Sequence, residues 1–279
     1  MKKILCPTDF SATAARALDY AIYIAQQAGG HLSLLHVVHL PIIDTSETAL
    51  VAGELLDEQL RDAEERMKAL VAQIVGKHSS GNFTCDYIVR EALLTDLTDH
   101  LTKHEGYDLV VMGTTGGGTA LEELLIGSNT EAVLDEVKCT LLAVPAQAPA
   151  PAFNKIIYAT DYDAEDLKAL QEVIGLGSLF NAPIDLVHVQ KEAGANSERG
   201  DTFLSQVKGA FPGVPLQLQE VVSRHRDEGL KNYFKEHNGS ILAILRRHKG
   251  FFAELFSQSL ADRMAYQAEV PLLVLHDKK

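Results

Sequence analysis

The stretch KILCPTD at residues Lys3–Asp9 decides the fold of this chain, because nearly the same phrase, KIIYATD, returns at Lys155–Asp161. A second pair of segments keeps the same spacing: Leu35–Val37 reads LHV and Val187–Val189 reads VHV. The separations 161 − 9 and 188 − 36 both equal 152 residues. Two matches in one register indicate an internal repeat of a whole structural unit. We therefore predict a tandem of two similar domains.

The repeat places the domain boundary near the middle of the 279-residue chain. Each copy is then close to the commonest domain size, roughly 100–150 residues. Between the copies lies the stretch AQAPAPA, in which alternating proline and alanine cannot continue a sheet or bury much surface. We predict a first domain at residues 1–145, a short stiff linker at 146–152 and a second domain at 153–279.

The composition is that of an ordinary globular protein, with 46% hydrophobic and 23% charged residues. No window approaches the roughly 18 unbroken apolar residues that a bilayer span needs, and Pro7 interrupts any N-terminal signal sequence. A net charge of −13 repels nucleic acid. We therefore expect neither a membrane nor a nucleic acid as partner.

The cysteine pattern bears on location and on metal binding. The chain has three cysteines, at Cys6, Cys85 and Cys139. Their odd number and wide spacing argue against a disulfide framework or a zinc ribbon and fit a reducing cytoplasm. His36 and His39 lie near Cys6 in the predicted sheet, but the spacing matches no zinc pattern, and His188 repeats His36 without a cysteine. We expect a cytoplasmic protein and no metal site.

In each copy, short β-rich runs alternate with segments of helical periodicity, which is the signature of a parallel α/β sheet. The runs of the first copy are 4–6, 32–38, 85–89, 109–112 and 141–144. Those of the second copy are 156–158, 184–189, 216–222, 241–245 and 272–275. We expect the strands to be buried on both faces by flanking helices.

Capping residues mark the first helix. Ser11 stands where an N-cap precedes a helix over 12–28, and Gly29 closes that helix before the next strand. A longer amphipathic helix is predicted over 50–75. By the last strand the offset between copies has fallen from 152 to 131 residues (270 − 139), mostly through loss of the part that matches 42–76. The corresponding helix of the second copy should therefore be shorter.

The copies differ most in the loop after the fourth strand, which reads GTTGGG at Gly113–Gly118 and LRRHKG at Leu245–Gly250. In the first copy, a strand end, flexible glycines and a helix start near Ser128 would present backbone N–H groups to an anion. No Lys or Arg lies between Gly113 and Glu131, so main-chain amides would hold it. The alternative is an ordinary strand-to-helix connection, because Ser128-x-x-Glu131 is also a capping box.

A second candidate element is Pro7-Thr8-Asp9, at the end of the first strand. Ligands of open parallel sheets sit beyond the carboxyl ends of the strands, where the strand order reverses. Asp9 is thus placed to accept hydrogen bonds from a ribose or a base. The alternative is a turn or cap before the helix. Its recurrence as Asp161, in the copy without the glycine run, supports that alternative.

The segments KILCPTDFS, LLHVV and MGTTG, with GSNT downstream, together resemble the universal stress protein family in its tandem two-domain form. The resemblance spans both copies, strongly in the first and weakly at the loop of the second. It implies two Rossmann-like domains, each with a five-stranded parallel sheet flanked by helices, similar to adenine nucleotide alpha hydrolases. It also implies ATP or another adenine nucleotide, with Mg²⁺ as companion ion, in members that keep the glycine motif.

By position, the resemblance implies a nucleotide site in the first domain. Asp9 would meet the base or ribose, and Val37 the adenine through its backbone. The glycines, with the two residues after Gly127, would hold the ribose and phosphates. The predicted site residues are Pro7, Thr8, Asp9, Val37, Gly113, Gly116, Gly127, Ser128 and Asn129.

Two departures from the family pattern bear on this site. Ten residues separate Gly116 from Gly127, where the pattern has nine, and the triple glycine could absorb the extra residue as a bulge. In the second copy Leu245 replaces Gly113, and its side chain would intrude where a phosphate should lie. We therefore expect nucleotide binding in the first domain only.

The leading interpretation is a cytoplasmic stress-response or regulatory protein that binds an adenine nucleotide, with the second domain as scaffold. The final strands of the two copies are expected to pair as an intrachain pseudo-dimer that hides their edges. A homodimer and an unknown protein partner are further expectations. Two alternatives stay open: a slow nucleotide hydrolase, although neither a positioned base nor a cation clamp is evident, and a ligand-free interaction scaffold. We identify no catalytic residue.

Overall fold

The computed structural model describes residues 2–38, 49–79, 81–114, 128–194, 197–246 and 270–276. The strands of the first half are β1 (Lys3–Pro7), β2 (His31–Val38), β3 (Thr84–Glu91), β4 (Leu109–Gly113) and β5 (Thr140–Val144). Those of the second half are β6 (Ile156–Ala159), β7 (Ile184–Gln190), β8 (Leu216–Val222), β9 (Ile241–Arg246) and β10 (Leu272–His276). The helices are α1 (Ala12–Ala28), α2 (Ala49–Lys77), α3 (Leu94–His104), α4 (Ser128–Glu136), α5 (Asp166–Phe180), α6 (Ser197–Ala210) and α7 (Arg226–Glu236).

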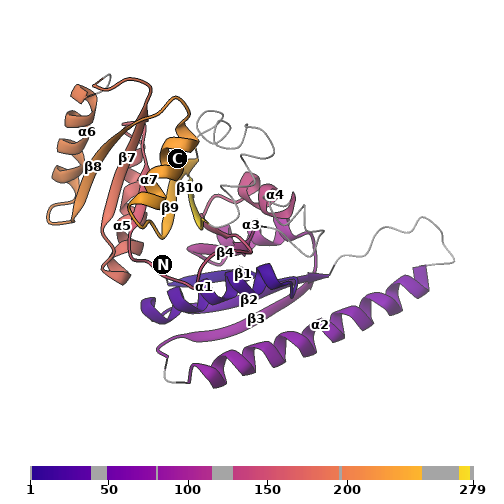
Figure 1. The fold of residues 1–279 in the computed structure, drawn as a ribbon. Helices are drawn as coiled ribbons and strands as arrows, with labels where there is room; N and C mark the ends of the chain where they lie inside the picture. Colours follow the sequence, from indigo (N-terminus) through magenta and orange to yellow (C-terminus); the bar gives the residue numbers. More distant parts are fainter. Residues whose placement is uncertain are drawn as a thin grey trace.

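The ten strands form one sheet in the order β3-β2-β1-β4-β5-β10-β9-β6-β7-β8. Within each half all neighbouring strands are parallel, as predicted. The halves meet at β5 and β10, which pair in antiparallel register with Leu273 opposite Leu142. Figure 1 shows the two halves side by side in this common sheet. The expected pairing of the two final strands is therefore confirmed.

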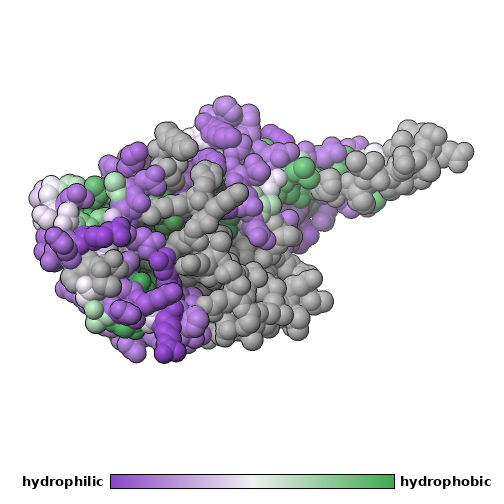
Figure 2. All heavy atoms as spheres, turned by 90° about the horizontal axis from the view of Figure 1, so that it is seen from above, coloured by the Kyte–Doolittle hydropathy of each residue, from purple (hydrophilic) through white to green (hydrophobic). Residues whose placement is uncertain are grey.

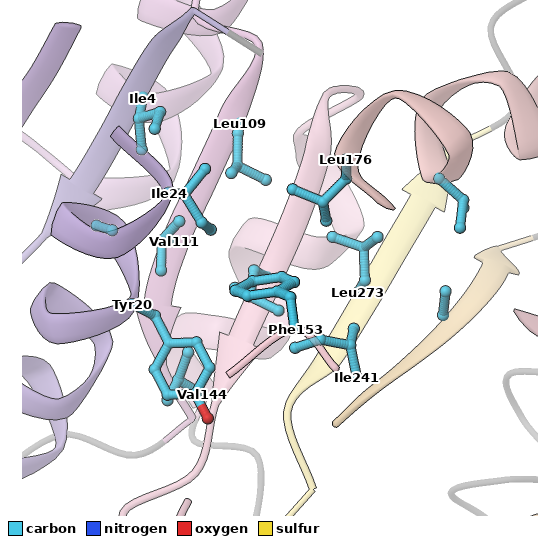
Figure 3. Close-up of a cluster of buried hydrophobic side chains, with 14 of the residues drawn as sticks. Ile4, Tyr20, Ile24, Leu109, Val111, Val144, Phe153, Leu176, Ile241 and Leu273 are labelled. Atoms are coloured by element: carbon cyan, nitrogen blue, oxygen red, sulfur yellow. The ribbon is translucent and has the colours of Figure 1, made fainter. Parts of the chain in front are cut away.

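Helices cover both faces of the sheet (Figure 1). The core on one face is closed by buried residues of α1, α2, α5 and α6, and the core on the other by residues of α3, α4 and α7. Figure 3 shows the first core crossing the junction between the halves, from Ile4 and Tyr20 through Phe153 to Leu176 and Leu273. On this face of the sheet, one continuous apolar core therefore joins the first half to the second.

The first helix begins and ends where the sequence predicts. The Oγ of Ser11 accepts a hydrogen bond from the N–H of Ala14 at 3.1 Å, which satisfies one of the orphan donors of the first turn. Gly29 ends the helix at φ 58°, a left-handed conformation that glycine adopts at little cost, and its N–H donates to the Ala25 carbonyl.

The long amphipathic helix is also confirmed. α2 has 29 residues against 14 in α6, its counterpart in the second half. Ala63, Met67 and Ile74 are buried against β2 and β3, because residues three or four apart share one face of a helix. Figure 1 shows α2 reaching well past the sheet, and Figure 2 shows hydrophobic residues among the hydrophilic ones along this arm. Among the described helices, none is apolar enough over a sufficient length to cross a bilayer.

The expectation that strands are buried on both faces is wrong for the two edge strands. Every residue of β5, at the centre of the sheet, is buried. In β3 only Val89 is buried, and in β8 only Leu216. An edge strand has a neighbour on one side only, and the flanking helices cover it incompletely, so half of its side chains stay in contact with water.

The linker packs more closely than expected. Ala148 is buried and the hydroxyl of Tyr20 donates to the carbonyl of Pro149 at 3.2 Å. Phe153, which follows the linker, stacks on Phe180 with ring centroids 4.2 Å apart, and Tyr23 stacks on both rings. Proline prevents this segment from joining the sheet, but the apolar groove between α1 and α5 still provides burial for it.

Candidate functional site

A cavity of about 410 Å³ opens at the carboxyl edge of the first half. It lies between the ends of β1 and β4, which are neighbours in the sheet although β2 and β3 intervene in the sequence. This is where the strand order reverses, so the loops after the two strands diverge and leave a crevice. Its volume falls within the range of roughly 300–1,000 Å³ that is usual for small-molecule sites.

The structure brings six of the nine predicted site residues together around this cavity. They are Pro7, Thr8, Asp9, Val37, Gly113 and Asn129. Ser128 is the first residue of α4, directly before Asn129. Gly116 and Gly127 lie outside the described residues, as do the other residues of the glycine run after position 114.

The end of β1 is held in place by the next strand of the sheet. The Nδ1 of His36 lies 2.7 Å from the carbonyl oxygen of Thr8, and because that oxygen can only accept, we assign the hydrogen to Nδ1. The N–H of Thr8 donates to the carbonyl of Leu35 at 2.8 Å. Phe10 follows at φ 63° and packs its ring on His36, with centroids 4.8 Å apart. His36 therefore positions the wall of the cavity.

Asp9 combines both of the roles considered for it. Its Oδ1 accepts a hydrogen bond from the N–H of Ser11 at 2.9 Å, which is an Asx turn leading into α1. The residue is exposed and lines the cavity as well. The turn fixes the direction of the side chain, so a carboxylate is held at the mouth of the crevice.

The opposite wall is formed by β4 and the first turn of α4. The hydroxyl of Thr130 donates to the carbonyl of Gly113 at 2.8 Å, which fastens the helix to the strand. Asn129 and Thr130 both line the cavity. The start of α4 is thus directed at the cavity, and the first N–H groups of a helix, at the positive end of its dipole, favour an anion there.

The third wall was not predicted from the sequence. Ala92, Leu93 and Leu94 join β3 to α3 and present an apolar surface to the cavity. Leu93 is 51% exposed, so its side chain is accessible from the cavity. These residues follow a predicted strand just as Asp9 follows the first, but that position alone does not show that β3 ends at this crevice.

Charge is sparse around the cavity. Among the described lining residues, Asp9 is the one with a permanent charge, and His36 is the other titratable group. The described residues contain no group of three or more possible metal ligands, and His39 lies outside them. Cys6 is buried below the site, and this burial raises the pKa of its thiol. The lining therefore suits an uncharged ring with polar groups at its edges.

The second half repeats the frame of the site with a different lining. The Nδ1 of His188 lies 2.8 Å from the carbonyl oxygen of Thr160, and Tyr162, at φ 62°, stacks on His188 where the first half has the tilted contact of Phe10 with His36. Leu245, which replaces the first glycine, is buried in β9, and it lines a separate cavity beside α5.

A doubled parallel α/β sheet, with a crevice where the strand order of the first half reverses, defines a class of tandem Rossmann-like proteins. A profile of the universal stress protein family matches residues 1–145 and again residues 152–276. The chain therefore belongs to the universal stress protein family.

Individual relatives agree with this assignment. Universal stress protein Slr1230 of Synechocystis is 24% identical over 269 residues, which cover 89% of this chain and 90% of that protein. Universal stress protein MJ0531 of Methanocaldococcus jannaschii is 29% identical over 147 residues, or 51% of this chain and 81% of that protein. A universal stress protein structure from Archaeoglobus fulgidus superposes with a TM-score of 0.73 at 17% identity, covering 99% of this chain and 98% of its own. That similarity supports the two-domain fold.

Proposed function

We propose that this universal stress protein binds ATP or a related adenine nucleotide in the cavity of its first half, and that occupancy of this cavity serves regulation under stress. The observation that carries the proposal is the convergence of six of the nine expected residues on one crevice where the strand order reverses. The size of the cavity, about 410 Å³, supports a small-molecule ligand.

The apolar wall would receive the base. Leu93, Leu94 and Val37 offer the flat, non-polar surface on which an adenine ring loses contact with water at little cost. Asp9, held by its turn with Ser11, is placed to accept hydrogen bonds from amino or hydroxyl groups at the edge of the base or ribose.

The start of α4 would receive the phosphates. Its first turn is fastened to β4 through Thr130 and Gly113, so its N–H groups are preorganised for an anion. Such binding by main-chain amides needs no basic side chain. Mg²⁺ would arrive with the phosphates, as their counter-ion.

The second half is assigned the role of a scaffold, because its frame is retained while Leu245 takes the place of Gly113. The domain boundaries 1–145 and 153–279, with residues 146–152 between them, belong to the same proposal. A cytoplasmic location, a homodimer and an unknown protein partner stay predictions.

Mass spectrometry of gently purified protein, followed by calorimetric titration with ATP, tests the proposal and its two alternatives. We expect a co-purified adenine nucleotide, or one saturable site for ATP, without steady release of phosphate. Steady phosphate release from the purified protein would favour the slow hydrolase. If no nucleotide co-purifies and ATP does not bind, the interaction scaffold is favoured and our proposal is contradicted.

Substitution of Asp9 separates its contact with the ligand from its turn. In Asp9→Asn the amide oxygen can still accept from Ser11, so the fold should be kept, but a charge-assisted hydrogen bond to the nucleotide is lost. We expect ATP affinity to fall about tenfold or more. Asp19→Asn, an exposed aspartate of α1, is the matched control and should bind like the wild type.

Substitution of Leu93 tests the apolar wall. Leu93→Asp would place a carboxylate beside the base and near the phosphates, and it should largely abolish ATP binding. Val75→Asp changes a residue of similar exposure, 49% against 51%, on α2. Equal ATP affinities of the two variants would contradict the assignment of this cavity.

A further inference from the structure

The second half contains a cavity of its own at the carboxyl ends of β6, β7 and β8, with a volume of about 560 Å³. It overlaps the place in the repeat that the crevice beside Asp9 occupies in the first half, because Asp161 and Val189 correspond to Asp9 and Val37, but none of its lining residues comes from β9, the counterpart of β4. The chemistry of its walls is different. Four cationic side chains line it, namely Lys191, Arg199, Arg224 and Arg226.

The exchange is clearest in the connection after the third strand of each half. In the first half this connection contributes Ala92, Leu93 and Leu94 to the cavity, and in the second half it contributes Ser223, Arg224 and Arg226. This connection therefore gives the first cavity an apolar wall and the second cavity a wall with two guanidinium groups. Three carboxylates also line the cavity and Glu220 lies in the wall beneath it, so the four cations bring the site to about neutral on a chain whose net charge is −13.

Two of the arginines contact the same residue, Asp161, one at its carboxylate and one at its main-chain carbonyl. The Nη1 of Arg226 donates to the Oδ2 of Asp161 at 3.5 Å, and the Nη2 of Arg199 donates to the carbonyl oxygen of Asp161 at 3.4 Å. The two arginines come from different helices, α7 and α6. Both contacts are long, so Asp161 is a weak internal partner that an external anion could replace.

The wall beneath the arginines is rigid. Tyr162 stacks on His188 with ring centroids 4.2 Å apart, and its hydroxyl donates to the Oε1 of Glu220 at 2.9 Å. The amide of Gln190 donates to the other oxygen of Glu220 at 3.0 Å. Because these side chains hold one another, the cavity would lose little conformational entropy when a ligand enters.

We propose that this second cavity binds a phosphate group, either as free phosphate or as part of a small phosphorylated molecule. Guanidinium groups present planar pairs of N–H donors that match the oxygens of phosphate, and their charge is retained at any physiological pH. The site would hold its anion through side chains of Arg199, Arg224 and Arg226, whereas the first cavity lacks arginine and lysine among its described lining residues.

Calorimetric titration with inorganic phosphate, pyrophosphate and glycerol 3-phosphate tests the proposal. Saturation at one site per chain supports it, and the relative affinities of the three probes distinguish free phosphate from a phosphate ester as the ligand. In Arg224→Ala/Arg226→Ala we expect the affinity to fall at least about tenfold, because charge-assisted hydrogen bonds are lost. Arg16→Ala/Arg61→Ala removes the same charge from exposed parts of α1 and α2 and should bind like the wild type.

Asp161→Asn removes the internal competitor and should strengthen binding several-fold. Circular dichroism confirms folding of each variant, and Arg224→Ala alone, at an exposed residue, replaces the double variant if that one is unstable. Absence of saturable binding, or equal loss in both double variants, would overturn the proposal. Weaker binding in Asp161→Asn would overturn it as well. Leu93→Asp should leave pyrophosphate binding unchanged, so failure of the nucleotide site is distinguishable from failure of this one.

Discussion

Gly113, the last residue of β4, lies so close to Thr13 of α1 that a Cβ atom built on it would come within 2.7 Å of the Thr13 Cγ2. The same Cβ would lie 3.1 Å from the backbone carbon and oxygen of Thr13. The first glycine of the predicted phosphate loop is therefore required for the packing of a helix on a strand, whatever ligand the loop holds.

We expect Gly113→Ala to destabilise the protein by about 1–3 kcal/mol, because the new methyl group must push β4 and α1 apart. Urea unfolding at equilibrium measures the loss. In Thr13→Ala/Gly113→Ala the destabilisation should be smaller than the sum of the single effects, since the closest clash is removed. Gly175→Ala is the control, because its Cβ would meet nothing within 4 Å and alanine favours its helix. If the destabilisation of the double variant equalled the sum of the two single effects, the side chain of Thr13 would not be the source of the strain.

The aromatic stack between the halves should carry a large share of the stability. Phe153 is 2% exposed and stacks with both Tyr23 of α1 and Phe180 of α5. Phe153→Ala should cost about 3–5 kcal/mol, through lost burial and the cavity left behind. Val75→Ala, at an exposed position, should change the free energy of unfolding by less than about 0.5 kcal/mol. Similar effects of the two substitutions in urea unfolding would refute the role of the stack.

His276 should make the protein sensitive to acid. Burial, with Arg246 and Lys138 nearby, lowers the pKa of His276 to about 4, and its Nε2 has no hydrogen-bond partner among the residues that the structure describes. In the unfolded chain the pKa is about 6.5, so between these values the unfolded state binds the extra proton. The contribution of His276 to stability is thus complete above about pH 6.5 and is lost as the pH falls through about 4.

Comparison of wild type with His276→Phe isolates this effect from that of the carboxylates. Between pH 7 and pH 5 the wild type should lose about 2 kcal/mol more stability than the variant. Urea unfolding at a series of pH values measures the difference. Parallel pH profiles of the two proteins would show that His276 is not held neutral by the fold.

The cap of α1 offers a local test of the helix that precedes the candidate site. Ser11→Ala removes the acceptor for the N–H of Ala14 and should cost about 1 kcal/mol. Ser178→Ala is the control, because Ser178 lies inside α5 with its hydroxyl on the carbonyl of Ile174, and alanine is the better helix former there. A cost of similar size in both variants would contradict the capping role.

Much of the fold could be predicted from local patterns. All ten strands and the limits of α1 follow from periodicity and capping, because buried parallel strands read as short apolar runs and Ser11 and Gly29 act on their immediate neighbours. The exposure of the side chains of β3 could not be predicted from such local patterns. Whether a strand has one neighbour or two depends on the order in which distant segments pair.

The candidate site was predictable only in part. Asp9, Val37 and Gly113 were found because they stand at strand ends or in a family motif, and the structure brings them together around one cavity. Leu93 was missed, since the sequence carries no signal that the end of β3 reaches the same crevice. The role of Gly113 beside Thr13 was missed for a similar reason, because 100 positions separate the two residues (113 − 13).

By itself, the sequence determined the doubling of the fold, the positions of its ten strands and of the first helix, and the position of the glycine run, because these depend on composition and on spacing over a few residues. Only the tertiary structure decided the register in which β5 and β10 pair, with Leu273 opposite Leu142, and the convergence of Arg199, Arg224 and Arg226 beside Asp161. Such arrangements arise from packing between segments far apart in the chain. No local pattern of residues encodes the distance between such segments.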